Sequence, residues 1–260
     1  MKGLRKLRKL KASVREKSVT SRYHARMPVL GRADLHMHTN FSDGWPTPEQ
    51  LVRHVADRTS LDVIAVTDHD TIEGALRAAA YSVAVGGPPV IVGEEVSSRD
   101  GHIVGLWLTR RVRPGMSAAA TVHAIHDQGG IAFAAHPFWR TERQARGRAT
   151  VHGVGWLAGE VDFDGIEVEN STPGFYVFNQ LAGRLNNAAH RAALGNSDAH
   201  ILDAVGTAYT AFPGRTEAAL RKAIEQRRTD ARRERHRVLG LVRYAAWGLN
   251  HQRVRALAAT

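Results

Sequence analysis

Apolar positions along the middle of the chain follow two periods that alternate in a regular order. Short apolar runs such as DVIAVTDHD (62–70) and IAFAAHP (131–137) have the length and boundaries of buried strands. The segment TPEQLVRHVADRTS (47–60) instead places Leu51, Val52 and Val55 at helical spacing after a proline-marked start. We predict strands over 31–39, 62–70, 89–98, 102–109, 131–137, 163–170, 192–200 and 205–212. We predict helices over 47–60, 72–85, 117–130, 175–191 and 216–228.

The near-alternation of strands and helices favours a parallel α/β architecture, most simply a barrel. A chain of 260 residues fits one such barrel with appendages, and its 43% apolar and 23% charged residues are ordinary for a globular protein. No apolar run approaches the roughly 20 residues that span a bilayer. The absence of cysteine excludes disulfides and thiolate ligands and is compatible with the cytoplasm, where we expect the protein.

Charge is distributed unevenly along the chain. Residues 1–32 carry 11 Lys and Arg against one acid, residues 215–260 carry 12 against four, and the residues between them carry 13 against 20. The basic ends could attract nucleic acid or an anionic membrane surface, or could be solvated tails. The N-terminal segment lacks the apolar core of a secretory signal, and we favour a simple basic arm over an organelle transit peptide. For residues 236–257 we favour a helix packed on the barrel over one lying on a membrane.

Histidines and acids gather where the predicted strands end. His36 and His38 stand one residue apart at the end of the first strand, so both imidazoles would point to one face. Such a pair alone is a weak signal, because most histidines are surface groups or satisfied core groups. His102 begins its strand and would join the others if that strand returned as an antiparallel hairpin. The candidate metal ligands are His36, His38, Asp43, His69, Glu95, His102, His136, Asp198 and His200.

The chemistry of these ligands narrows the choice of metal. Imidazole and carboxylate ligands without sulfur suit Zn, Mn or Fe better than Ca or Mg. Nine candidates exceed the need of one tetrahedral ion and divide among three divalent ions, with a carboxylate able to bridge two of them. Each residue alone is more often structural than ligating, but their recurrence at successive strand ends favours a metal centre.

The motifs resemble those of the PHP (polymerase and histidinol phosphatase) superfamily. DLHMHTNFSDG, TDHD, GEEVSS followed by GH, AAHP and GNSDAH occur in the family's order over roughly residues 32–228. The resemblance implies a distorted (β/α)7 TIM-like barrel with a trinuclear metal centre. We therefore expect a basic N-terminal arm over 1–31, the PHP barrel over 32–228 and a basic C-terminal helical extension over 229–260.

The same resemblance implies how the ligands are shared. One metal would be held by His36, His38, Glu95 and Asp198, a second by Asp43, His69 and His200, and a third by Glu95, His102 and His136. Some members have histidine where Asp43 stands. Glu95 is chosen over Glu94 because of the family pattern around it, which leaves Glu94 a supporting or structural role. Asp68 is then expected to orient a ligand.

The resemblance further implies phosphoesterase chemistry. We expect hydrolysis of phosphomonoesters of a small metabolite or nucleotide by metal-activated hydroxide. Asp198 and His200 are the candidate catalytic residues, and His200 is a candidate for protonating the leaving oxygen. Arg140, just after AAHPFW, is a candidate for binding the substrate phosphate, although an ordinary loop arginine is slightly preferred.

Three other functions remain open. A 5′-3′ exonuclease on short oligonucleotides would use the same centre, with the basic ends guiding a strand. A non-catalytic nucleic-acid or membrane-binding module has no need for nine ligands. An amidohydrolase would be expected to have a bridging lysine, yet no lysine lies between Lys17 and Lys222. Only 33 residues separate His102 from His136, so a large inserted specificity subdomain is absent there, which weakens the nucleotide assignment.

Overall fold

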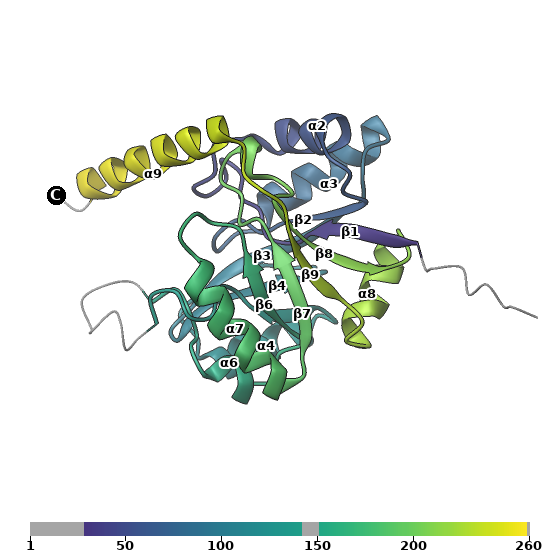
Figure 1. Ribbon diagram of the computed structural model, residues 1–260, viewed down its shortest axis with the longest axis vertical. Coiled ribbons are helices and arrows are strands. Elements are labelled where there is room, and N and C mark those ends of the chain that lie inside the picture. Colours follow the sequence, from purple (N-terminus) through teal and green to yellow (C-terminus); the bar gives the residue numbers. More distant parts are fainter. Residues whose placement is uncertain (1–28, 142–150, 259–260) are drawn as a thin grey trace, which may run out of the picture.

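A nine-stranded sheet forms the centre of the described part of the chain, residues 29–141 and 151–258. In the computed structural model its strand order is β7-β6-β5-β4-β3-β2-β1-β8-β9 (Figure 1). The strands are β1 (Leu30–Asp34), β2 (Val63–Val66), β3 (Val90–Ser98), β4 (Gly101–Leu106), β5 (Ile131–Ala134), β6 (Gly165–Asn170), β7 (Ala192–Asn196), β8 (Ala208–Pro213) and β9 (Asp230–Arg233).

The sheet curls into a nearly closed barrel. Strand β7 stands at one end of the strand order, yet it meets β8, where the Thr210 hydroxyl donates to the Gly195 carbonyl and accepts from the Gly195 N–H, both at 3.0 Å. A Cβ at Gly195 would lie 2.7 Å from the Tyr209 carbonyl oxygen, so the approach requires glycine. The predicted distorted TIM-like barrel is confirmed.

Both parallel and antiparallel pairs build this barrel. Strands β1, β2 and β3 pair in parallel, as do β5, β6 and β7. Strand β4 runs antiparallel to β3 and to β5, and Ser97 faces His102 in the first pair. The hairpin expected for His102 is therefore present, and it returns this side chain to the end of β3.

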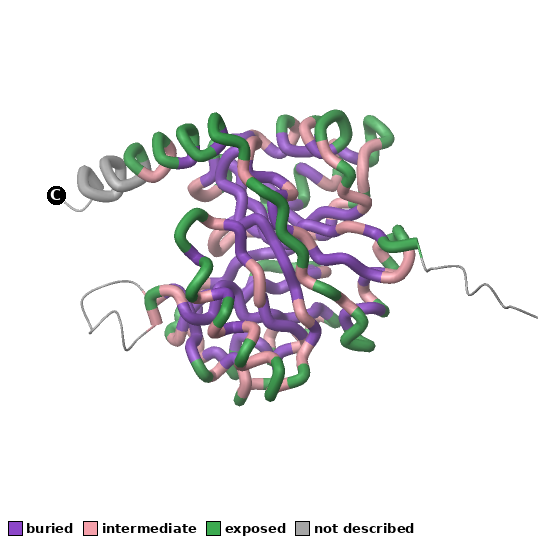
Figure 2. The backbone as a smooth tube through the Cα atoms, in the orientation of Figure 1, coloured by how far each residue is buried: buried purple, intermediate pink, exposed green. Residues whose placement is uncertain are grey.

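The helices follow the strands as the sequence predicts. They are α2 (Pro48–Arg58), α3 (Glu73–Val85), α4 (Ala118–His126), α6 (Leu157–Glu160), α7 (Tyr176–Ala189), α8 (Glu217–Glu225), α9 (Val238–Ala258) and the 3-10 turn η1 (Leu202–Ala204). Helix α2 begins with a capping box, in which Thr47 and Gln50 each accept from the other's backbone N–H. Strands β2 and β5 are buried at every position, as expected for strands covered on both faces (Figure 2).

The C-terminal segment extends the fold beyond residue 228, where we expected the barrel to end. Strand β9 pairs antiparallel with β8, and α9 then begins beside η1, where Arg243 donates to Asp203 at 2.8 Å. Tyr244 is buried, and the rest of α9 projects away from the barrel (Figure 1). Within the described ranges no helix is long and apolar enough to cross a membrane. The predicted basic arm falls mostly on residues 1–28, outside the described residues.

Candidate metal centre

The chain segments that follow four strands meet at one end of the barrel. The His38 N–H donates to the Ala199 carbonyl at 2.9 Å, and His69 forms a bridge with Glu95. The segments after β1, β2 and β7 thus lie against one another and against β3, which carries Glu95 itself, so their side chains meet on the inner face of the barrel. The structure brings all nine predicted ligands into four overlapping groups, which are His38–Asp43–His69–His200, His36–His136–Asp198, His36–His38–Glu95 and His69–Glu95–His102.

The carboxylate of Glu95 lies at the centre of the cluster. Five imidazole nitrogens lie within 3.3 Å of its two oxygens, and they belong to His36, His38, His69, His102 and His136. A carboxylate offers about four lone-pair sites, so hydrogen bonds alone do not account for five neighbours. A carboxylate that bridges cations does account for them.

The cluster has two parts that differ in exposure. We call His36, His136 and Asp198 the inner group and His38, Asp43, His69 and His200 the outer group. In the outer group, Asp43 Oδ1 lies 3.2 Å from His200 Nε2, and the side chains of Asp43 and His69 are 16% and 24% exposed. The His36 side chain is fully buried. The outer group therefore contains the two most exposed side chains of the cluster, those of Asp43 and His69.

Hydrogen bonding and charge test whether these residues fit metal ions. The nitrogens His36 Nε2, His38 Nε2 and His102 Nδ1 are buried without a hydrogen-bond partner of suitable geometry. Burial would lower the pKa of His38, but Asp198 and Glu95 raise it to about 10. Although burial opposes it, the neighbouring imidazoles of His36, His38 and His200 hold the pKa of Asp198 well below its usual range.

Ionised carboxylates beside imidazoles with free nitrogens are the donors that divalent cations bind, displacing the imidazole protons. The residues present therefore fit a metal centre. Two of them also have unusual backbone conformations, since φ is 25° at His136 and 52° at Asp198. Positive φ at non-glycine residues is uncommon and concentrates at functional sites, where the surrounding structure fixes it.

Sequence comparison connects this geometry with a family. The PHP domain pattern matches residues 34–146 and the PHP-associated pattern matches residues 178–229, so the matched ranges contain all nine ligand candidates. A protein of Methanocaldococcus jannaschii is 30% identical over 162 residues, which are 58% of this chain and 88% of that protein. The chain belongs to the PHP superfamily.

Two bacterial relatives match a shorter part of the PHP domain. A 3′,5′-nucleoside bisphosphate phosphatase of Chromobacterium violaceum is 41% identical over 83 residues, 30% of this chain and 28% of the relative. A 5′-3′ exoribonuclease of Haemophilus influenzae is 43% identical over 89 residues, 33% of this chain and 31% of the relative. The match to this chain thus spans less than a third of each of these two proteins.

Solved structures confirm the PHP fold. A two-domain Bacteroides vulgatus protein containing a predicted PHP-like metal-dependent phosphoesterase aligns with a TM-score of 0.62 at 23% identity, covering 80% of this chain and 66% of that one. The lesion-specific endonuclease PfuEndoQ of Pyrococcus furiosus aligns with a TM-score of 0.52 at 16% identity, covering 76% of this chain and 56% of that one. At these identities the likeness concerns the barrel alone.

A buried carboxylate that the sequence reading missed supports the inner group of this PHP centre. Glu167 on β6 accepts from His36 Nδ1 at 3.1 Å and from the His136 N–H at 2.7 Å. The side-chain amides of Asn170 and Asn196 also donate to it, both at 2.9 Å. Such a partner fixes the tautomer and orientation of a ligating imidazole. The available signal was an acid within the strand GIEVEN whose two adjacent residues, Ile166 and Val168, are apolar.

Two further acids have supporting roles outside the cluster. Asp68 accepts from the Thr39 N–H and hydroxyl at 2.7 and 2.6 Å and from the Ser42 hydroxyl at 2.6 Å. It therefore shapes the loop that carries Asp43 and contacts no member of the cluster through these bonds. Glu94 accepts from the Val112 N–H at 2.7 Å, and so lies on the face of β3 opposite Glu95.

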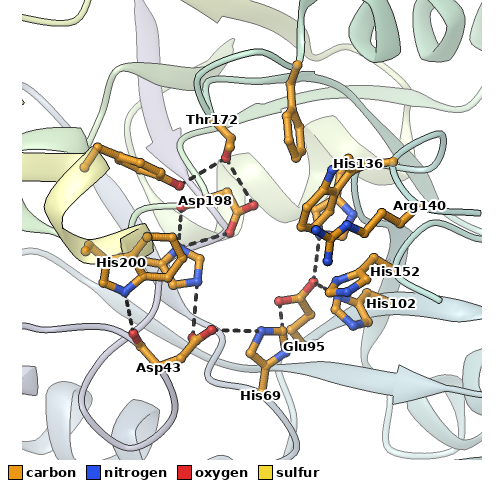
Figure 3. Close-up of a pocket in the computed structure, with 15 residues that line it drawn as sticks. Asp43, His69, Glu95, His102, His136, Arg140, His152, Thr172, Asp198 and His200 are labelled. Carbon is orange, nitrogen blue, oxygen red and sulfur yellow. Dashed lines mark hydrogen bonds and ion pairs between the residues drawn. The ribbon is translucent and has the colours of Figure 1, made fainter. Parts of the chain in front are cut away.

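An open pocket of about 210 Å³ lies above the metal centre. Figure 3 shows the labelled histidines and acids around it, with Arg140 and His152 on one side and Thr172 near Asp198. Four aromatic residues complete its lining, which are Trp139, Phe175, Tyr244 and Trp247. Arg140 is thus at the pocket, its guanidinium 4.9 Å from the centre of the Trp139 ring.

His152 is a pocket residue that no pattern in the sequence singled out. Its ring lies 4.7 Å from that of His102 and 4.5 Å from that of Trp139, and its buried Nε2 has no hydrogen-bond partner. Burial, together with the charges of His102 and His136, lowers the pKa of His152 to about 3. No strand end or motif marks this position, so only the folded chain reveals it.

Proposed function

We propose that the protein is a metal-dependent phosphoesterase that hydrolyses phosphomonoesters of a small metabolite or nucleotide. The observation that carries the proposal is the convergence of five imidazole nitrogens on the buried Glu95 carboxylate, directly beneath an open pocket with Arg140 in its lining. Histidine and carboxylate donors at this density favour transition-metal ions or Zn.

Three divalent ions are the number that we propose for the centre. His36, His38, Glu95 and Asp198 would hold the first, Asp43, His69 and His200 the second, and Glu95, His102 and His136 the third. Glu95 lies within 3.3 Å of ligands from all three sets, which supports a bridging role. When bound, such ions supply positive charge that acidifies water and stabilises phosphate oxygens.

The chain's own residues would bind and orient the ester. Arg140 offers a planar guanidinium, which can donate two hydrogen bonds to phosphate oxygens. The Thr172 hydroxyl lies 3.4 Å from Asp198 Oδ2 and so stands where a substrate oxygen would enter. His200 lines the pocket, but its Nε2 would bind the second ion and its Nδ1 faces the Asp198 carbonyl at 2.9 Å, so the ring would orient the site rather than protonate the leaving oxygen. Asp198 keeps its negative charge beside it.

The pocket favours a small substrate over a long strand. Its volume of about 210 Å³ and its four aromatic residues suit a compact organic phosphate, whose apolar part would lie against the rings. The 5′-3′ exonuclease is the second candidate, because one relative is named a 5′-3′ exoribonuclease and the ends of the chain are basic. A cytoplasmic location and a nucleic-acid or anionic membrane partner for the basic ends stay predictions.

A substrate panel tests the proposal. Phosphate release would be measured from histidinol phosphate, mononucleotides, bisphosphonucleotides and 5′-phosphorylated short oligonucleotides, for the wild type and for Asp198→Ala. We expect turnover of a monoester that is lost on chelation, restored by divalent cations and abolished in Asp198→Ala. Turnover restricted to oligonucleotides would favour the exonuclease, and turnover that survives both chelation and the substitution would refute the metal-dependent mechanism.

A further inference from the structure

Helix α9 contributes to the pocket although it lies outside both family-matched ranges, the second of which ends at residue 229. Two of its side chains, Tyr244 and Trp247, line the pocket above the metal centre. They come from a different part of the chain than any of the nine ligand candidates. The helix therefore touches the site without belonging to the shared PHP motifs.

Trp247 contacts the outer group at two points. Its indole N–H donates to the main-chain carbonyl of Asp43 at 2.8 Å, and its ring centre lies 4.2 Å from that of His200. The loop of Asp43 is also tied to His200 directly, because the Trp45 N–H donates to the His200 carbonyl at 2.8 Å. One indole thus contacts both of the segments that carry Asp43 and His200.

The rest of α9 is weakly attached. Apart from these two residues, the described part of α9 contacts the barrel near its start, where the Gly240 backbone approaches Asp203 and the Arg243 side chain forms an exposed pair with Asp203; exposed pairs contribute little stability. Several of its large apolar side chains face solvent, namely Val238, Leu239, Leu241, Val242 and Leu249. A helix held mainly through Tyr244 and Trp247 can respond to a change in the groups that those two rings touch.

We propose that Trp247 is a positioning residue that couples the docking of α9 to cation binding at the outer group. By fixing the Asp43 carbonyl and the His200 ring, the docked helix holds both ligands in the geometry that a cation needs. Coupling between two binding events is reciprocal, so a cation at the outer group also stabilises the docked helix. The proposal rests on the proposed function only in requiring that the outer group binds a cation.

Cation titration of full-length variants tests the coupling without substrate. Metal-free wild type, Trp247→Ala and Trp247→Phe would be titrated with Zn²⁺, with Leu249→Ala as the matched control because Leu249 is 65% exposed on the same helix. We expect one class of sites to weaken about tenfold in Trp247→Ala, within the range for residues that orient metal ligands. Trp247→Phe keeps an aromatic ring but loses the N–H donor, so its Zn²⁺ affinity should lie between those of the wild type and Trp247→Ala. Leu249→Ala should bind Zn²⁺ as tightly as the wild type.

Hydrogen exchange supplies the reciprocal measurement. In the wild type and in Leu249→Ala, Zn²⁺ should slow exchange of the α9 amides, and in Trp247→Ala this protection should be lost. If Trp247→Ala does not fold, Arg243→Ala loosens the helix away from the pocket and should weaken the same class of sites to a smaller extent. Unchanged Zn²⁺ affinity in Trp247→Phe and Arg243→Ala, with exchange of α9 insensitive to Zn²⁺, would overturn the coupling.

The two proposals fail in different ways. Zn²⁺-dependent protection of α9 in a protein that releases no phosphate from any ester would refute the proposed function and leave the coupling standing. Phosphate release by a protein in which Zn²⁺ does not change exchange of the α9 amides would refute the coupling and leave the proposed function standing. In an active enzyme, Trp247→Phe should lower kcat and leave KM nearly unchanged, because the indole orients ligands; a change in KM alone would assign Trp247 to substrate binding instead.

Discussion

The inner and outer groups of the metal centre are supported by different kinds of structure. The inner group is buried, and its His36 and His136 are held by Glu167 of strand β6. The outer group is partly exposed, and its Asp43 sits on a loop held by Asp68 and by Trp247 of the C-terminal helix.

This difference separates what the barrel fixes from what its surroundings adjust. Candidate ligands that directly follow a strand and have a buried carboxylate behind them are preorganised, because neither backbone nor ring can turn without breaking buried hydrogen bonds. A loop-borne ligand has fewer such constraints and depends on whatever packs over it. We therefore expect perturbation of the inner group to affect the whole centre and perturbation of the outer group to stay local.

The largest effect is expected from Glu95→Gln, because this carboxylate joins the two groups. The substitution keeps the shape but removes the charge that five imidazole nitrogens face. Loss of a residue that orients a metal ligand costs 10–100-fold, so loss of a bridging carboxylate should exceed about 100-fold in phosphate release. Bound metal, measured by elemental analysis, should fall at the inner and outer groups together.

The adjacent acid provides the matched control. Burial raises the pKa of Glu94 to about 7, so glutamine resembles a form that this carboxyl already takes near neutral pH, and its amide oxygen can still accept from Val112. Glu94→Gln should therefore keep metal content and phosphate release within about twofold of wild type. An equal loss in both variants would mean that fold disruption, rather than loss of the bridge, explains Glu95→Gln.

An intermediate effect is expected from Glu167→Gln, which acts on the centre through the inner group. The amide can still accept one hydrogen bond but cannot serve His36, His136 and both asparagines as the carboxylate does. We expect about 10–100-fold weaker binding of the cations that His36 and His136 would hold, measured by titration of metal-free protein.

Glu169→Gln is the control for this substitution, two residues along β6. Glu169 accepts from Arg233 at 3.0 Å and from Asn179 at 2.9 Å and touches no member of the cluster through these bonds. The Glu169→Gln protein should bind cations with the same affinity as the wild type. A Glu167→Gln protein that weakened only the outer group would contradict the division of the centre into two parts.

Local sequence patterns marked the members of the His/Asp/Glu cluster better than the residues that support them. His36, His38, Glu95 and Asp198 follow apolar runs, and the local pattern of a strand end is enough to mark them. Glu167 supports His36 across 131 residues of sequence, so no local pattern connects the two.

The same limit applies to the edges of the fold. Strand β9, DARR, has none of the apolar alternation that predicts a strand, and it forms because β8 offers it a free edge. The contact of Trp247 with Asp43 spans 204 residues, and the spacing of residues 236–257 predicted only a helix. Local patterns predict the order of the barrel elements and the residues that gather in the cluster, whereas closure of the pocket depends on tertiary packing.

The smallest effect is expected from Asp68→Asn, which loosens the loop of the outer group. One side-chain oxygen remains, so part of the set of bonds from Thr39 and Ser42 is lost, and the unfolding free energy should fall by about 1–3 kcal/mol. Denaturant unfolding of the metal-free protein measures this loss, and Ser42→Ala, which removes a single donor, should lose less.

Because the loop carries Asp43 but no inner ligand, cation affinity in Asp68→Asn should weaken a few-fold at the outer group and stay unchanged at the inner group. Equal weakening at both groups would show that the loop and the strands behave as one rigid unit, and the comparison between them would then fail.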